Sequence, residues 1–229
     1  MSAYFVTATG TDIGKTFVAS GLLRYLRGQR KVVAGIKPVI SGFDIAKARA
    51  SDAGELLDAM GEAVTSEAIE QISPWRFAAP LSPDMAAAHE GKAIDFEALV
   101  AFCRDAAAWP GTLLIEGVGG VMVPLDAQHT VLDWMAALSL PAILVTGSYL
   151  GTLSHTLTAA SAMAQAGAKI AALVVNDSGN GAASDTAATL RRFLTETPIA
   201  ILPRMAGSAD FAVLVTELFQ GDDGKPIKN

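Results

Sequence analysis

The sequence predicts an α/β fold in which a mostly parallel β-sheet is covered by helices on both faces. Several short runs rich in β-branched and other apolar residues are separated by stretches with the apolar spacing of helices. Runs that are apolar on both faces indicate strands buried on both sides, as in a parallel sheet between two helical layers. The chain of 229 residues fits one domain, since no linker or fixed-period repeat divides it.

The expected elements alternate along the chain. The first strand covers residues 3–8, and the helix over 15–27 follows because Val18, Leu22 and Leu26 recur at intervals of four. Further strands are expected at 31–36, 112–116, 141–146, 170–175 and 199–202. Further helices are expected at 52–60, 83–90, 94–107, 152–166, 182–194 and 209–219. The polar residues 220–229 are expected to form a frayed tail.

Composition limits the function classes. Hydrophobic residues make up 51% of the chain and charged residues 17%, which is typical of a globular protein. The net charge of −6 argues against nucleic acid and anionic membranes as partners. No apolar run approaches the roughly 20 residues of a membrane span, and the first residues lack the pattern of a signal peptide. With Cys103 as its single cysteine, the chain is expected in the reducing cytoplasm.

A loop with the residues of a phosphate site follows the first strand. The stretch "TATGTDIGKT" (7–16) ends in Gly14-Lys15-Thr16 at the start of a helix, where backbone N–H groups point at phosphate. Lys15 is expected to reach the β- and γ-phosphates of ATP, and Thr16 to bind Mg²⁺. The usual pattern G-x-x-x-x-G-K-[ST] would place a glycine at Thr9, although Gly10 supplies backbone freedom. The sequence thus predicts a P-loop NTPase fold; the alternative is a tight turn with an exposed lysine.

Polar residues also end other predicted strands. "LLIEGVGG" (113–120) ends an apolar strand in Glu116, where a metal-binding carboxylate is expected. Lys37 in "GIKPVISG" (35–42) would oppose Lys15 and neutralise anionic reactants, or would simply lie at a solvated strand exit. Asn176 in "VVND" ends another predicted strand, where an Asn-Asp pair is also a common turn former. Asp52 in "SDA" opens a predicted helix, where it could be an ordinary N-terminal charge.

In order and spacing, these segments resemble the dethiobiotin synthetases, an ATP-dependent carboxylase-cyclase family. "GIKPVISG" resembles the family's K-P-[IV]-x-[ST]-G, and "EGVGG" (116–120) its E-G-A-G-G. "WRFAAPLSPDMAA" (75–87) and "SYLGTLSHTLTA" (148–159) resemble two further family segments, and the resemblance extends from residue 3 to about 203. The chain departs from the family pattern at Ala8, where a glycine is usual, at Val118, where an alanine is common, and at Ser154, where an asparagine is usual.

The resemblance implies a role for each matching residue. Lys15 and Lys37 would be catalytic, because Lys37 contacts both the transferred phosphate and a substrate carbamate in the family. Mg²⁺ would be bound by Thr16, Asp52 and Glu116. The nucleotide would be bound by Asp12, Ile13, Gly14, Lys15, Thr16, Asn176 and Pro203. The substrate would be bound by Thr11, Lys37, Ser41, Gly119, Gly151, Thr152, Leu153 and Ser154.

The implied reaction joins 7,8-diaminopelargonic acid, CO₂ or bicarbonate and ATP to give dethiobiotin. The resemblance also implies a homodimer with the substrate at the two-fold interface. Two alternatives share the loop. A septum-site or partition ATPase would carry a signature lysine at position 10, where this chain has Gly10. A cobalamin-pathway amidoligase would need a glutaminase domain for which the chain has no room. No transition-metal site is expected, and Trp75, Trp109 and Trp134 are expected in the core.

Overall fold

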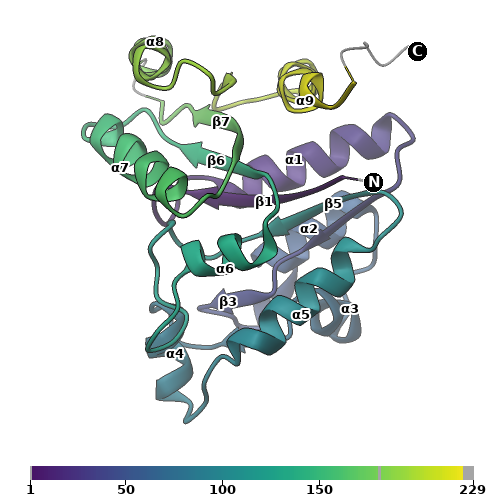
Figure 1. The fold of residues 1–229 in the computed structure, drawn as a ribbon. Coiled ribbons are helices and arrows are strands. Elements are labelled where there is room, and N and C mark those ends of the chain that lie inside the picture. Colours follow the sequence, from purple (N-terminus) through teal and green to yellow (C-terminus); the bar gives the residue numbers. More distant parts are fainter. Residues whose placement is uncertain (1, 180–181, 224–229) are drawn as a thin grey trace.

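The computed structural model describes residues 2–179 and 182–223, and its centre is an open parallel sheet (Figure 1). Within those residues the sheet has six strands in the order β2-β5-β1-β6-β7-β8, and each neighbouring pair is parallel. The strands are β1 (Ser2–Ala8), β2 (Val33–Ile36), β5 (Thr112–Glu116), β6 (Ala142–Thr146), β7 (Ile170–Asn176) and β8 (Ile199–Leu202). The predicted fold class and the six predicted strands are confirmed.

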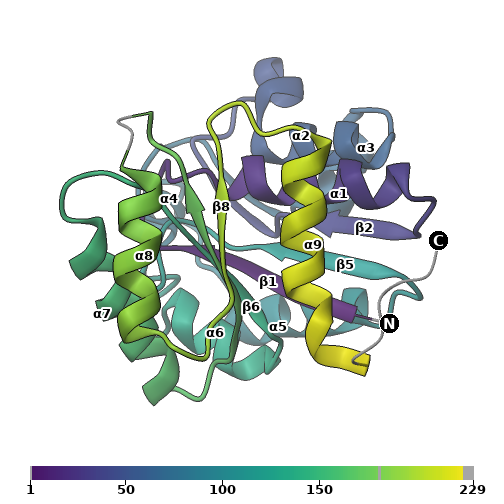
Figure 2. The ribbon, with the colours of Figure 1, turned by 90° about the horizontal axis from the view of Figure 1, so that it is seen from above.

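Helices cover both faces of this sheet (Figure 2). They are α1 (Lys15–Gly28), α2 (Asp52–Met60), α3 (Ser66–Ile72), α4 (Pro83–His89), α5 (Phe96–Ala107), α6 (Val131–Leu138), α7 (Thr152–Gln165), α8 (Ala183–Phe193) and α9 (Ser208–Asp223). All the expected helices are present with small shifts at their ends. Helix α9 reaches Asp223, into the tail expected to fray from residue 220, and residues 224–229 lie outside the described residues. No helix in the described part is long and apolar enough to cross a membrane.

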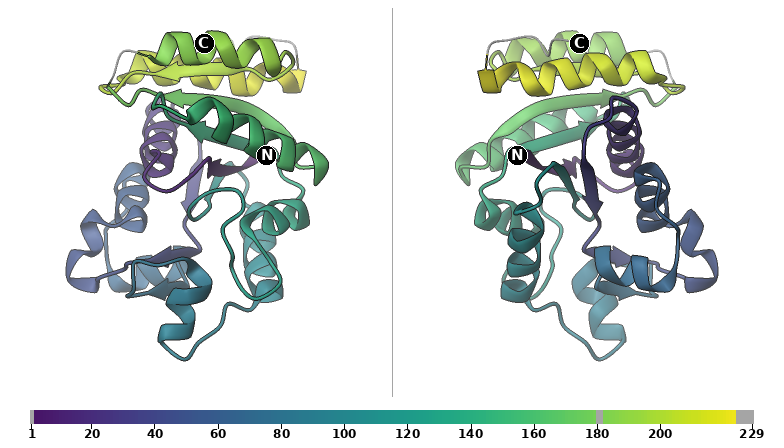
Figure 3. Two further views of the ribbon diagram at one scale, coloured as in Figure 1. Left: turned by 90° about the vertical axis from the view of Figure 1, so that its left-hand side faces the viewer. Right: turned by 90° about the vertical axis from the view of Figure 1, so that its right-hand side faces the viewer.

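Some short elements were not expected from the sequence. Strands β3 (Val39–Ser41) and β4 (Trp75–Phe77) form a separate parallel pair, and a 3₁₀ helix η1 (Ile45–Ala50) precedes α2. Figure 3 shows α3 and α4 at one end of the molecule, with α8 and α9 at the opposite end. Strands of three residues are too short for a periodic pattern, so the sequence gives little sign of them.

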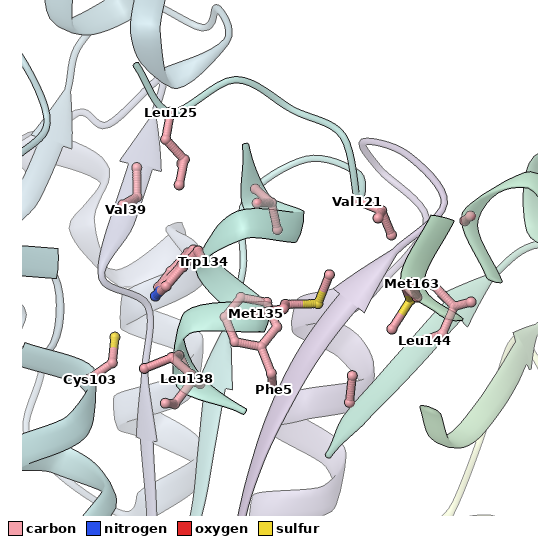
Figure 4. Packing of buried hydrophobic residues seen from close by; sticks show 14 of the residues in the cluster. Phe5, Val39, Cys103, Val121, Leu125, Trp134, Met135, Leu138, Leu144 and Met163 are labelled. Carbon is pink, nitrogen blue, oxygen red and sulfur yellow. The ribbon is translucent and has the colours of Figure 1, made fainter. Parts of the chain in front are cut away.

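Two apolar layers hold the sheet in place. Tyr4 and Val6 of β1 face a layer formed with α1, α2 and α9, whereas Phe5 faces a layer formed with α5 to α8. Figure 4 shows the second layer around Phe5 and Trp134, whose rings meet edge to face with centroids 4.8 Å apart. Trp134 is fully buried as predicted, but the prediction for Trp109 is wrong, because it is 44% exposed in the turn after α5.

Candidate active site

The candidate site lies at the carboxyl ends of three adjacent strands. Strand β1 leads into the loop 9–14, and β5 and β6 flank β1 in the sheet. Glu116 is the last residue of β5 and Thr146 the last residue of β6. Because parallel strands all end at the same edge, the loop is bordered by Glu116 on one side and Thr146 on the other, which is where ligands bind in open α/β sheets.

The loop before α1 is held in the shape that an anion site requires. Asp12 and Gly14 both have positive φ, of 57° and 102°. The Asn176 side chain donates to the Ile13 carbonyl over 2.9 Å, and a Cβ on Gly14 would lie 2.3 Å from that amide nitrogen. Glycine is therefore required at position 14. No side chain of the described residues caps the start of α1, which leaves its first N–H groups for a ligand.

The missing glycine at position 9 has a structural explanation. The Thr9 amide donates to the Val145 carbonyl over 3.0 Å, so residue 9 still follows the pairing of β1 with β6. The close approach occurs instead at Gly120, where a Cβ would lie 3.2 Å from the Cα of Gly10. The glycine-rich segment after Glu116 thus packs directly against the phosphate loop, and the close approach that favours glycine lies at Gly120.

A buried charged cluster lies beside the loop. The Lys37 ammonium lies 2.7 Å from Glu116 Oε1 and 2.8 Å from Asp52 Oδ2, and donates to the Gly117 carbonyl over 2.8 Å. Thr16 donates its hydroxyl to Glu116 Oε1 over 2.7 Å. The structure therefore brings together four of the predicted site residues from β5, α1, α2 and the segment after β2.

Burial and mutual attraction set the charges of this cluster. Burial acts to lower the pKa of Lys37, but Glu116 and Asp52 outweigh it and raise that pKa. Burial likewise acts to raise the pKa of Asp52, but Lys37 overcomes it and holds that pKa below its usual range. No carboxylate among the described residues contacts Lys15, so burial, assisted by the charge of Lys37, lowers its pKa to about 8.

The oxygen atoms of the cluster fit Mg²⁺. Thr16, Asp52 and Glu116 supply one hydroxyl and two carboxylates, and hard oxygen ligands are what Mg²⁺ prefers. Glu116 Oε2 is buried and has no hydrogen-bond partner among the described residues. A buried carboxylate oxygen of this kind is costly unless something binds it. The donor set and this unpaired oxygen both suit a divalent cation.

A pocket extends along the sheet edge from the loop. It has a volume of about 390 Å³ and is lined by Asp12, Ile13, Phe17, Gly147, Tyr149, Asn176, Asp177, Ser178 and Arg204. The predicted residues Asp12, Ile13 and Asn176 are among these. Pro203 does not line the pocket, but its neighbour Arg204 does. Arg204 stands where the sequence resemblance weakens, so the family pattern could not have indicated it.

The predicted substrate residues are distributed around the edge of this region. Ser41, at the end of β3, has a buried hydroxyl without a partner in the described part of the chain. Thr11 is exposed in the loop. Gly119 has a φ of 58°, and a side chain there would collide with Val123. The contacts of these residues with substrate stay predictions.

The start of α7 presents two kinds of side chain. Gly151 has a φ of 96° before the helix. Thr152 is buried and donates to the Gly147 carbonyl over 2.9 Å, so its hydroxyl serves the fold. Leu153 is partly buried against the core, whereas Ser154 is exposed. Of these residues, Ser154 is the one whose polar side chain is free to meet a ligand.

A cluster of threonine hydroxyls was not predicted. Thr146 Oγ1 lies 3.2 Å from that of Thr9, 2.8 Å from that of Thr152 and 2.7 Å from that of Thr156. Thr146 and Thr156 are fully buried. The cluster joins the phosphate loop to the first turn of α7. A threonine that ends an otherwise apolar strand, as Glu116 ends β5, is the sequence signal that could have indicated it.

Known proteins resemble this chain over most of its length. The family described as "AAA domain" matches residues 2–210. The ATP-dependent dethiobiotin synthetase BioD of Acidiphilium cryptum is 53% identical over 77% of this chain and 80% of its own length. The protein of the same name from Phenylobacterium zucineum is 45% identical over 95% of this chain and 94% of its own length.

Solved structures share the fold at low identity. The cell division ATPase MinD of Pyrococcus furiosus has a TM-score of 0.53 and 18% identity, over 95% of this chain and 98% of that chain. A ParA family ATPase from Chlorobium tepidum has a TM-score of 0.53 and 14% identity, over 95% of each chain. Identities this low support the P-loop fold alone. The partition ATPase alternative therefore gains nothing beyond the fold.

Proposed function

This chain belongs to the family of ATP-dependent dethiobiotin synthetases, and we propose that it forms dethiobiotin by the reaction set out here. One amine of 7,8-diaminopelargonic acid takes up CO₂ as a carbamate. ATP phosphorylates the carbamate oxygen, and the neighbouring amine attacks the mixed anhydride and expels phosphate, which closes a cyclic urea. The chain is thus an ATP-dependent ligase of biotin biosynthesis, and no covalent enzyme intermediate is required.

The two lysines carry the chemical step in this proposal. The phosphoryl group and the carbamate are both anionic, and they repel each other unless cations lie between them. Lys15 would bind the β- and γ-phosphates from the loop, and Lys37 would act where phosphate meets carbamate. The observation that supports this most directly is the contact of Lys37 with both Glu116 and Asp52, because it places the second lysine beside the proposed metal ligands.

Mg²⁺ is proposed as the cofactor that binds with ATP. Thr16, Asp52 and Glu116 would hold it, and the ion would neutralise charge on the phosphates. Of these residues, Glu116 has the position that the fold fixes most firmly, because its side chain is fully buried at the end of β5.

The remaining predicted contacts follow the shape of the site. Asp12, Ile13 and Gly14 would surround the phosphates through backbone N–H groups, and Asn176 would contact the base in the adjoining pocket. The unpaired hydroxyl of Ser41 supports a contact with the carbamate. Thr11, Gly119 and the amino end of α7, residues 151–154, would bind the diamine and its carboxylate.

We further propose that the protein acts as a cytoplasmic homodimer, with residues 151–154 of one subunit facing the loop of its partner. An isologous dimer then holds two composite sites. Lys37→Ala and Ser154→Trp variants, each inactive, should regain about a quarter of wild-type activity when refolded together, since half of the dimers are mixed and each has one intact site. Mixed dimers without activity would show that each site lies within one chain.

A direct assay tests the function. Purified protein is incubated with 7,8-diaminopelargonate, bicarbonate and Mg·ATP, and dethiobiotin and ADP are followed by mass spectrometry. Equal amounts of the two products are expected, with none in the absence of the diamine. ADP release without dethiobiotin, independent of the diamine, would contradict the proposal and favour a regulatory ATPase.

A further inference from the structure

The Lys37 ammonium occupies the position of a cation that bridges Glu116 and Asp52. It lies 2.7 Å from the first carboxylate and 2.8 Å from the second. The same two carboxylates are the proposed ligands of Mg²⁺, so the inference rests on the proposed function. We propose that Lys37 and the metal ion compete for Glu116 and Asp52, and that Mg²⁺ displaces Lys37 only when it arrives with a polyphosphate.

Every hydrogen-bond donor of the Lys37 ammonium is already used. The three ammonium protons of Lys37 have three acceptors, which are Glu116 Oε1, Asp52 Oδ2 and the Gly117 carbonyl. Glu116 Oε1 also accepts the Thr16 hydroxyl. A divalent ion in contact with both carboxylates would therefore lie next to the ammonium, where the repulsion between two cations is strong. One of them has to leave.

The charge balance of the site decides whether Lys37 or the metal ion binds Glu116 and Asp52. Glu116 and Asp52 carry two negative charges, and Lys37 and Lys15 carry two positive charges that act on both carboxylates. A metal ion alone would add two positive charges to a balanced cluster in which Glu116 and Lys37 are buried and Asp52 is half-buried. A polyphosphate adds several negative charges and gives both lysines a new partner. The metal and the nucleotide therefore bind as one event, and this event frees Lys37 at the moment when phosphate and carbamate need it.

The test measures metal binding to protein without nucleotide. Mn²⁺ is titrated into the wild type and into Lys37→Met, and free Mn²⁺ is followed by electron paramagnetic resonance. The variant loses the competing cation but keeps both carboxylates, so its affinity for Mn²⁺ should rise at least about tenfold. Lys15→Met is the matched control, because the Lys15 ammonium contacts the Gly10 carbonyl at 3.4 Å and no carboxylate. It should give a smaller gain.

Without Lys37 the buried Glu116 carboxylate and the half-buried Asp52 carboxylate lose their cation and destabilise the protein, so Lys37→Gln is made in parallel. Glutamine removes the charge and keeps two N–H donors for the carboxylates. Folding of each variant is confirmed by circular dichroism before titration. If wild type binds Mn²⁺ as tightly as either folded Lys37 variant, or more tightly, the competition does not exist.

A second substitution separates this inference from the proposed function. Adding Glu116→Gln to the Lys37 variant should abolish the gained Mn²⁺ site. If tight binding persists, the metal lies elsewhere and the assignment of Glu116 as a ligand fails as well. If no variant binds Mn²⁺ alone while the wild type still makes dethiobiotin with Mg·ATP, the competition is wrong and the function stands.

Discussion

Two buried polar clusters border the phosphate loop, and they differ in charge. On the β5 side, Glu116 meets Lys37 and Asp52 in a cluster of full charges. On the β6 side, Thr146 meets other hydroxyls and nothing ionised among its described contacts. Glu116 and Thr146 hold equivalent places, at the ends of the strands that flank β1, and both are fully buried.

This difference in charge indicates different roles for the two clusters. Buried charges lose their hydration, so the β5 cluster contributes little net stability and depends on every member being present. The threonines are neutral, and Thr152 and Thr156 also donate to backbone carbonyls. The four hydroxyls make five short contacts, so with one proton each they can satisfy at most four at once. We infer that the β5 side serves the reaction and the β6 side fixes the loop against α7.

The largest effect is expected when the charged cluster is broken at Glu116. Glu116→Gln keeps the shape and removes the charge that faces Lys37, so the free energy of unfolding should fall by roughly 3 kcal/mol in urea titrations. Turnover should fall at least tenfold, which corresponds to about 1.4 kcal/mol of barrier. The exposed Glu62→Gln is the control and should leave both unchanged. Normal turnover of Glu116→Gln at limiting Mg²⁺ would contradict the metal assignment.

The pH dependence of stability tests the charge of Lys15, which also belongs to the charged part of the site. Burial lowers its pKa from 10.5 to about 8, so the folded protein holds this proton more weakly than the unfolded chain. Below pH 8 Lys15 is protonated in both the folded and the unfolded protein, so the full cost of burying its charge applies. Between pH 8 and 10.5 the unfolded state binds more protons, so stability attributable to Lys15 rises with pH, and above 10.5 the destabilisation is gone.

At pH 7 the free energy of unfolding of Lys15→Met, measured by urea titration, should therefore exceed that of the wild type by on the order of 2 kcal/mol. The variant should also lose ATP binding. The difference between the two proteins should shrink as the pH is raised toward 10. A variant less stable than wild type at pH 7 would show that Lys15 is not a buried charge that destabilises the fold.

The sequence predicted the sheet and the charged side for a physical reason. Strands apolar on both faces leave a periodic signal, and a charged residue that ends such a strand has few structural explanations. Glu116 stood out in this way, whereas Lys37 could also have been a solvated strand exit, and its ion pair with Glu116 was not predicted. The position of Asp52 at the start of α2 was compatible with an ordinary helix charge, and only the fold brought it to Lys37.

The neutral side and the far end of the pocket could not be predicted in the same way. Thr146 ends an apolar strand as Glu116 does, but threonine is common in strands, so its signal is weaker than that of a charged residue. Arg204 joins the pocket from the segment after β8, far along the chain from the loop, and only tertiary structure brings them together. Trp109 was predicted in the core as an aromatic residue, but a residue in the loop after a helix has no face that must be buried.

The smallest effect is expected at Thr146, and it tests whether the hydroxyl cluster stabilises the fold. Thr146→Val keeps the shape and removes one hydroxyl that contacts three others. Thr152 and Thr156 keep their backbone acceptors, so the free energy of unfolding should fall by only about 1 kcal/mol. The KM for ATP should rise a few-fold, because Thr9 loses its link to β6, while kcat should change less.

Thr7→Val is the matched control for this change. Thr7 lies on β1 and is also buried, but its hydroxyl has no hydrogen-bond partner in the described part of the chain. Removing an unpaired buried hydroxyl should leave stability unchanged or raise it. A double-mutant cycle with Thr9→Val then isolates the link to the loop, since the two substitutions should be less than additive. If Thr146→Val is as harmless as Thr7→Val, the contacts around Thr146 do not stabilise the fold, and positioning of α7 must come from apolar packing alone.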